Sequence, residues 1–303
     1  MDSAMILFKQ LLQMMIYIAI GFALYRAKLV TKEGSKALSH LLLYVVLPCA
    51  IANSFRIERT AQAVTEIGLS LLFALIALVI AVVISQLFFR KRPIDSFGAS
   101  FSNAGFMGIP LITAVLGSSS VCYIAGLVAM LNTMQWTYGQ WLLTGDKNKM
   151  SPKAILTSPI VLAFIAGLIL FFTQLPLPSI VGNSISAIAA CNGPVAMIIL
   201  GVLLGQCNLK DIFTDKFAYL NSLVRLVIIP LATLLAFWLI PAQWSAIRMA
   251  LFLAACAPVG SNVAVYAQKL DMDPSYASCT VCLSTLLSVV TMPVMMMLAQ
   301  MIW

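Results

Sequence analysis

Long apolar runs separated by short polar connections constrain this chain more than any other feature. A bilayer core about 30 Å thick needs roughly 20 apolar residues per helix, and we find ten runs of that kind in the sequence. Hydrophobic residues make up 62% of the chain and charged residues only 9%, whereas charged residues supply about a quarter of a soluble protein. This composition excludes a soluble enzyme and a nucleic-acid-binding protein, and it predicts an all-α integral membrane protein.

The runs favour helices over a transmembrane barrel, because barrel strands alternate polar and apolar residues in segments of about ten. No such alternation is visible in the sequence. The predicted spans are Ala4–Tyr25, Leu38–Phe55, Ile67–Phe89, Phe97–Leu116, Val121–Leu143, Ala154–Leu175, Ile180–Leu204, Phe217–Ile240, Ile247–Ala267 and Ala277–Trp303.

Basic residues in the connections predict the orientation of the chain in the cell membrane. The odd-numbered connections carry thirteen Lys and Arg residues, and the even-numbered connections and the termini carry four. Because basic connections stay in the cytoplasm, we expect a multi-pass protein with both termini outside. The first span lacks a basic segment before its apolar run, so we interpret it as a retained helix and not as a cleaved signal peptide.

The polar connection Thr144–Lys153 divides the chain into two halves that resemble each other. Gly21 and Gly167 lie 146 positions apart, and so do Pro48 and Pro194. Since five spans per half is an odd number, the second half must insert upside down relative to the first. We therefore predict two inverted five-helix repeats, residues 1–143 and 154–303, joined by a cytoplasmic linker at 144–153, as in many secondary transporters.

The fourth and ninth predicted spans are the most heavily interrupted by Gly, Pro and small polar residues. Pro removes a backbone donor and clashes with the preceding turn, and Gly allows conformations that other residues avoid. We therefore expect both helices to open within the membrane, at Asn103–Pro110 and Pro258–Asn262. Open backbone at that depth must be buried in protein or face a water-filled cavity, so the two breaks should meet at a shared cavity. Packing or simple kinking is the alternative reading of isolated Gly and Pro.

A second half-helix that begins at each break points its free N–H groups and its positive dipole end at this cavity. Carboxylates and phosphates bind at helix N-termini for this reason. The amides of Asn103 and Asn262 would add donors without a fixed charge, and a tyrosine one turn farther on would cover the substrate. The candidate substrate-binding residues are Ser102, Asn103, Gly105, Gly108, Pro110, Pro258, Gly260, Ser261, Asn262 and Tyr266.

Two sets of polar residues outside the breaks each have two possible interpretations. Arg225 is the only strongly charged residue far from the ends of a predicted span, and it is either a substrate contact on the cytoplasmic side or a snorkelling anchor. Asn132 and Gln135 in the fifth span either line the transport unit or bond between helices.

Cys279 and Cys282 form a lone CxxC without a second pair, which is weak evidence for a metal site, so we expect no metal and no cofactor.

The coupling mechanism follows from what the spans lack. All ten acidic residues lie in connections or near predicted span ends, so the usual proton relay or charged sodium ligand is missing. His40, the single histidine, reads as a packing or interfacial residue. An anion leaves an inside-negative cell downhill by about 2.3 kcal/mol per charge at 100 mV, which favours uniport. Sodium held by backbone carbonyls and Asn or Ser oxygens is the alternative.

The sequence resembles the auxin efflux carrier family, which includes plant PIN-type auxin transporters and bacterial malate or malonate carriers. The resemblance covers the whole chain. It rests on LPCAIANSF at Leu47–Phe55, SNAGFMGIPL at Ser102–Leu111, NGPVAMIILGVLLG at Asn192–Gly205 and APVGSNVAVYA at Ala257–Ala267.

This resemblance implies a fold related to sodium/proton antiporters and bile-acid transporters, with the two broken helices crossing in an X. It also implies a dimerising scaffold of the first, second, sixth and seventh helices and an elevator-type transport unit of the others. The family's crossover residues would map onto Asn103, Asn262, Pro110 and Pro258. The acidic and basic cluster of some plant members is reduced here to Glu66, with Ser70 four residues on, so auxin itself is not carried over.

We therefore expect a homodimeric exporter of small organic anions such as carboxylates, working by alternating access in the lipid bilayer. A sodium-coupled importer on the same fold is the first alternative, and a non-transporting receptor or scaffold is the second. An intramembrane enzyme is the least favoured alternative, because the spans contain no Ser/His pair, paired carboxylates or metal-ligand cluster.

Overall fold

The computed structural model describes residues 2–146 and 157–303, and these residues form helices and no β-strand. Most of the predicted linker 144–153 and the predicted start of the sixth span at Ala154 lie outside the described residues. The helices are α1 (Asp2–Arg26), α2 (Lys32–Leu41), η1 (Leu42–Val46), α3 (Leu47–Ser54), α4 (Ala61–Phe89), α5 (Pro93–Ser100), η2 (Ala104–Gly108), α6 (Ile109–Leu116), η3 (Ser118–Ser120), α7 (Val121–Met134), η4 (Gln135–Gly139), α8 (Gln140–Thr144), α10 (Pro159–Thr173), α11 (Ser179–Ala190), α12 (Asn192–Gln206), α13 (Leu209–Thr214), α14 (Lys216–Leu223), η6 (Val224–Ile228), α15 (Ile229–Phe237), η7 (Ala242–Trp244), α16 (Ser245–Cys256), α17 (Asn262–Lys269) and α18 (Pro274–Ile302).

Six helical stretches in the described part of the chain are long and apolar enough to cross a membrane. They are Ser3–Arg26, Lys32–Ser54, Ala61–Phe89, Ser179–Gln206, Lys216–Phe237 and Pro274–Ile302, and they coincide with the first, second, third, seventh, eighth and tenth predicted spans. The helical fold and these stretches agree with the predicted integral membrane protein. The ten-span inverted repeat stays a prediction.

Three of the helical stretches widen into a π-helical turn that ends two residues before a proline. The turns are η1, η2 and η6, and the prolines are Pro48, Pro110 and Pro230. A proline inside a helix removes one hydrogen bond and its ring presses on the carbonyl of the preceding turn. A widened turn accommodates that ring while the helix continues, so these prolines do not end their helices.

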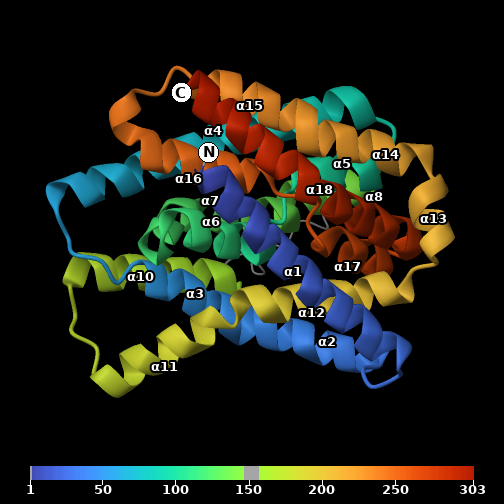
Figure 1. The fold of residues 1–303 in the computed structure, drawn as a ribbon, viewed down its shortest axis with the longest axis horizontal. Coiled ribbons are helices and arrows are strands. Elements are labelled where there is room, and N and C mark those ends of the chain that lie inside the picture. Colours follow the sequence, from blue (N-terminus) through green and yellow to red (C-terminus); the bar gives the residue numbers. More distant parts are fainter. Residues whose placement is uncertain (1, 147–156) are drawn as a thin grey trace.

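Helices α1 and α12 pack against each other at glycines (Figure 1). A Cβ atom on Gly21 would lie 2.0 Å from the backbone oxygen of Ile198, and one on Gly201 would lie 2.0 Å from that of Ile18. Small residues allow helix backbones to approach this closely in membranes, where packing drives association. This contact joins the first and seventh predicted spans.

The helices fall into two groups in Figure 1. Helices α2, α3, α10, α11 and α12 lie along one side of the molecule, and α4, α14, α15 and α18 lie along the other. Within the first group α3 packs on α10 and α11, and within the second α14 packs on α18 and α15 on α4. The scaffold and transport unit stay a prediction.

The two predicted breaks are present, but one lies at a different place. The fourth span is interrupted at Phe101–Asn103, between α5 and η2, and not within the whole stretch Asn103–Pro110. The expectation that Gly105, Gly108 and Pro110 open the helix was wrong, because the π-helical turn absorbs the proline. The ninth span is interrupted at Ala257–Ser261, between α16 and α17, as expected.

Candidate functional site

The two interrupted segments cross and bond to each other through their backbones. Ser102 and Val259 form an isolated antiparallel bridge. The N–H of Asn103 donates to the carbonyl of Pro258 over 2.8 Å, and the N–H of Gly260 donates to the carbonyl of Phe101 over 2.9 Å. These bonds satisfy backbone groups that would otherwise be unpaired at membrane depth. Four half-helix ends therefore meet at one point, which we call the crossover (101–103 and 257–261).

Glycine is required at the tightest point of the crossover. A Cβ atom on Gly260 would lie 2.9 Å from the carbonyl oxygen of Phe101 and 3.3 Å from that of Ser102. Both atoms belong to backbone, which cannot rotate away as a side chain can. The small residue predicted at this position therefore serves close backbone approach.

Two cavities adjoin the crossover. The smaller has a volume of about 40 Å³ and the larger about 510 Å³. Five residues line both cavities: Leu43, Asn103, Phe106, Ser261 and Asn262. Pockets that bind small molecules usually have volumes of about 300–1,000 Å³, so the larger cavity has room for a small organic molecule and the smaller has room only for water.

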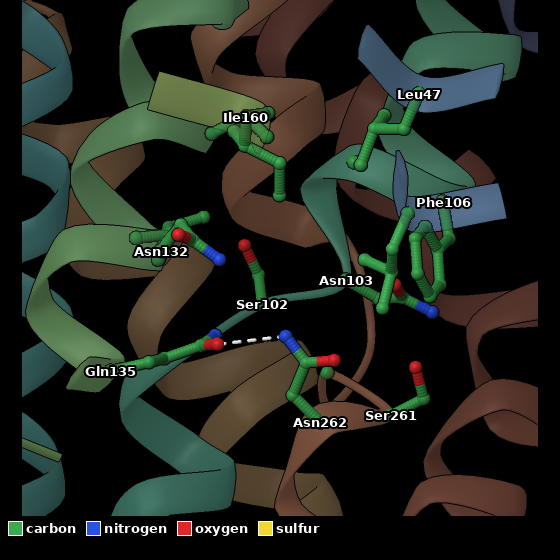
Figure 2. Close-up of a pocket in the computed structure, with 14 residues that line it drawn as sticks. Leu47, Ser102, Asn103, Phe106, Asn132, Gln135, Ile160, Ser261 and Asn262 are labelled. Carbon is green, nitrogen blue, oxygen red and sulfur yellow. Dashed lines mark hydrogen bonds between the residues drawn. The ribbon is translucent and has the colours of Figure 1, made fainter. Parts of the chain in front are cut away.

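Polar side chains surround the smaller cavity. Asn262 donates through Nδ2 to Oε1 of Gln135 over 2.7 Å, the bond drawn dashed in Figure 2. The hydroxyl of Ser158 donates to Oδ1 of Asn132 over 2.6 Å. Ser102 also lines this cavity, together with Gly105 and Gly260. Asn132 and Gln135 both line this cavity, and the side-chain oxygen of each accepts a hydrogen bond from another segment.

The side-chain donor of Asn103 is both buried and without a partner. The residue is 5% exposed, and its Nδ2 atom makes no hydrogen bond within the described structure. A buried polar group without a partner costs about 1–3 kcal/mol. Figure 2 shows its side chain on the same side of the crossover as Ser261 and Phe106, away from the Gln135–Asn262 bond. Asn103 thus places an unpartnered donor beside the larger cavity.

The larger cavity leads from the crossover to basic side chains. Its far part is lined by Lys32, Lys36 and His40 of α2, and no described Asp or Glu lines it. His40 is exposed and packs its ring edge-on against Tyr44, with centroids 5.9 Å apart. His40 therefore lies on the wall of the larger cavity. The far part of the wall therefore carries two lysine charges, and neutral residues line the part at the crossover.

Arg225 lies behind the crossover and not in either cavity. Its side chain is 1% exposed. Its guanidinium donates to the carbonyl of Ala257 over 3.0 Å, to that of Ala99 over 3.1 Å, and to that of Ala255. The guanidinium thus reaches neither cavity and lies in the interior, where backbone carbonyls hold it, which agrees with neither interpretation made from the sequence.

Five other predicted site residues lie outside the two cavities. Tyr266 packs in an aromatic cluster, with ring centroids 5.2 Å from Phe97 and 5.5 Å from Trp136, so it does not cover the larger cavity. Glu66 accepts from the hydroxyl of Tyr123 over 2.6 Å. Gly108 faces Ala254 of α16, and Pro110 faces Gly193 of α12. Pro258 contributes its carbonyl to Asn103.

Sequence reasoning missed Asn192 and the basic end of the larger cavity. Asn192 is buried at the start of α12, and its Nδ2 donates to the carbonyl of Gly105 over 3.1 Å. The signal was present in the Asn-Gly-Pro sequence at 192–194, an amide beside residues that favour close packing. Lys32 and Lys36 were counted for topology only, because the sequence does not show that α2 borders the crossover.

Comparisons with known proteins decide the family. The family model described as "Membrane transport protein", which represents the auxin efflux carriers, matches residues 6–155 and 146–296. The chain belongs to the auxin efflux carrier family. It is a membrane transporter and not an enzyme, as predicted.

Curated relatives of this auxin efflux carrier family member cover nearly its whole length. An "Uncharacterized transporter" of Methanothermobacter thermautotrophicus is 24% identical, covering 93% of this chain and 95% of its own length. A "Putative malonate transporter" of Rhizobium meliloti is 26% identical, covering 88% of each chain. The "Uncharacterized transporter YfdV" of Escherichia coli K12 is 22% identical, covering 96% of this chain and 97% of its own length.

Proposed function

We propose that this carrier exports small organic anions such as carboxylates, driven by the membrane potential, and that it binds them at the crossover end of the larger cavity. The observation that carries the proposal is the unpartnered Nδ2 donor of Asn103, buried beside Ser261 in a cavity that no described carboxylate lines. A carboxylate oxygen is the acceptor that this donor lacks. The name of the Rhizobium meliloti relative supports the same class of substrate.

Helix dipoles make the proposed site electropositive. The stretch from η2 to α6 and helix α17 both begin at the crossover, and a helix N-terminus carries about half a positive elementary charge. Two such ends supply about one positive charge beside Asn103. A carboxylate placed there gains charge-assisted hydrogen bonds without a lysine or arginine that would hold it too tightly for release.

Access to the site is one-sided. The larger cavity joins the crossover to Lys32 and Lys36, which the positive-inside rule assigns to the cytoplasm. With that orientation the conformation is inward-facing, and a cytoplasmic anion enters past the two lysines. Electrostatic attraction of this kind raises the local concentration of the anion at the mouth of the cavity.

The elevator movement we propose slides the third to fifth and eighth to tenth predicted spans along the first, second, sixth and seventh. Two hydrogen bonds cross this boundary near the site: Asn192 to Gly105, and Ser158 to Asn132. Both must break when the crossover moves, and both involve neutral groups whose bonds are worth only about 0.5–1.5 kcal/mol each. Two copies of the carrier would associate through the first, second, sixth and seventh predicted spans.

The test is a thermal-shift titration of the purified carrier with matched pairs of compounds. Each pair consists of a dicarboxylate or monocarboxylate and the amide of the same carbon skeleton, for example malonate and malonamide. A ligand that binds only the folded protein raises its melting temperature, so we expect shifts with carboxylates and none with amides. Equal shifts within pairs, or no shift with any carboxylate, would refute anion binding.

Transport is then measured as carboxylate flux in proteoliposomes loaded with the carboxylate that binds. A potassium diffusion potential, negative on the cytoplasmic side, should accelerate efflux of the anion from that side. Binding without flux at any potential would favour the receptor hypothesis.

A further inference from the structure

We propose that Arg225 is the resident cation of the crossover and occupies the position that a coupling sodium ion would take, so that this carrier transports without sodium. The proposal rests on the proposed function for its flux measurement only. Its structural part concerns how Arg225 holds the two broken helices together.

The guanidinium bonds to the C-terminal ends of both first half-helices. The carbonyl of Ala99 lies in the last turn of α5, and the carbonyls of Ala255 and Ala257 lie at the end of α16. The last four carbonyls of a helix have no partner within the helix. One planar side chain thus caps two helices that belong to different halves of the sequence.

The charges at this point balance. A helix C-terminus carries about half a negative elementary charge, so the two converging ends carry about one negative charge together. The single positive charge of Arg225 neutralises them. Within the described residues Arg225 has no ion pair with an Asp or Glu, and the ion pair that is present joins Arg92 and Asp95. The backbone is therefore the counter-ion of Arg225.

The local helix geometry delivers the side chain to this place. Arg225 lies in the π-helical turn η6, two residues after Leu223 ends α14 and five before Pro230. Four residues earlier, Asn221 donates to the backbone carbonyl of Asp95 over 2.7 Å. The same helical stretch therefore holds the beginning of α5 through Asn221 and its end through Arg225.

This arrangement bears directly on ion coupling. Sodium-coupled carriers with broken helices coordinate the ion with unwound backbone carbonyls and half-helix C-terminal ends. Here the guanidinium already bonds to carbonyls of that kind, and a fixed positive charge repels a second cation from the same place. Each movement of the crossover then carries Arg225 in place of an exchangeable ion.

The test combines ion replacement with chemical rescue. In wild-type proteoliposomes we expect carboxylate flux to be unchanged when choline replaces sodium on both sides. In Arg225→Ala we expect flux to fall roughly tenfold or more, the fold-change that corresponds to about 1.4 kcal/mol. Millimolar guanidinium chloride should restore flux and raise the melting temperature of the variant, because the free ion refills the position left by the side chain.

Arg248→Ala is the matched control. Arg248 is also a buried arginine that donates to a backbone carbonyl, that of Ile240 over 3.0 Å, but it lies outside the crossover. We expect its loss to lower the melting temperature and to leave flux per folded protein unchanged, with or without guanidinium. Arg225→Lys provides a second variant that keeps the charge, in case Arg225→Ala does not fold, and it should retain more flux than Arg225→Gln.

The outcomes separate the two proposals. A wild-type flux that disappears without sodium would overturn the resident-cation proposal and leave the anion site standing. A wild-type protein that transports no anion under any ionic condition would overturn the proposed function. The effect of guanidinium on the melting temperature of Arg225→Ala would still test the role of Arg225, and equal effects on wild type and variant would overturn it.

Discussion

Replacing Asn103 with alanine tests the binding site most directly, because the structure predicts opposite effects on binding and on stability. The Nδ2 donor is buried and unpartnered in the ligand-free protein. A substitution that deletes it therefore removes no hydrogen bond of the side chain. The backbone bond from Asn103 to Pro258 is kept in Asn103→Ala.

The magnitudes follow from hydrogen-bond energetics. A bond from this amide to a charged carboxylate contributes about 1.5–3 kcal/mol, so its loss should weaken binding by roughly 10- to 150-fold. The ligand-free variant should be as stable as the wild type or more stable, since an unsatisfied buried donor costs about 1–3 kcal/mol. Asn103→Asp should bind still more weakly, because it puts a negative charge beside the anion.

The assay is a carboxylate titration by thermal shift in detergent, with the melting temperature of the ligand-free protein recorded on the same samples. Asn221→Ala is the control, because its Nδ2 atom is engaged with the carbonyl of Asp95 over 2.7 Å and lies outside both cavities. That variant should lose stability and keep its affinity. If Asn103→Ala binds carboxylates as tightly as the wild type, or melts well below it, the assigned role of Asn103 is wrong.

Three further substitutions, with Gly68→Ala as a control, test the framework around the site. Gly260→Ala should abolish binding and lower the melting temperature, because its Cβ would lie 2.9 Å from the Phe101 carbonyl oxygen. Gly68 lies within a helix, and a Cβ atom there would have no other atom within 4 Å. Gly68→Ala should therefore raise the free energy of unfolding by about 0.5–1 kcal/mol in a thermal melt. Gly201→Ala should separate α1 from α12 and reduce the yield of folded monodisperse protein on size exclusion, since its Cβ would lie 2.0 Å from the Ile18 oxygen. Tyr276→Phe should cost about 1–3 kcal/mol of unfolding free energy, because its hydroxyl bonds to the buried carboxylate of Asp95 over 2.5 Å; an unchanged melting curve would show that this bond contributes nothing.

The sequence predicted the crossover because its residues break a strong local rule. Clusters of Gly, Pro and an amide within an apolar span favour an opened backbone, which must be buried in protein or face a cavity, and two such clusters at equivalent positions pointed to one place. Asn103 and Asn262 were found on that basis. The positions of the helix ends were harder to predict, because a proline can either end a helix or widen one turn, and Pro110 does the second.

Tertiary placement decided the residues that sequence reasoning misassigned. Tyr266 lies one turn after Asn262, which suggested a lid, but α17 turns its ring toward Phe97 and Trp136. Arg225 suggested a substrate contact because charges in spans are usually functional. Its acceptors are backbone carbonyls from two distant segments, and no sequence pattern marks a carbonyl as unpaired.

The charge of Arg225 also determines which step of transport the membrane potential drives. Helix dipoles have no net charge, so the crossover with its four half-helix ends carries the single positive charge of Arg225, and a bound monocarboxylate makes it neutral. In the predicted elevator the loaded unit then crosses the membrane with no net charge, and the empty unit returns with one positive charge, worth about 2.3 kcal/mol at 100 mV if it crosses the whole field. An inside-negative potential would therefore speed the inward return of the empty site. Voltage steps on membranes containing substrate-free protein should produce transient currents in the wild type, and these currents should shrink in Arg225→Gln. Transient currents that persist unchanged in that variant would assign the moving charge to another group.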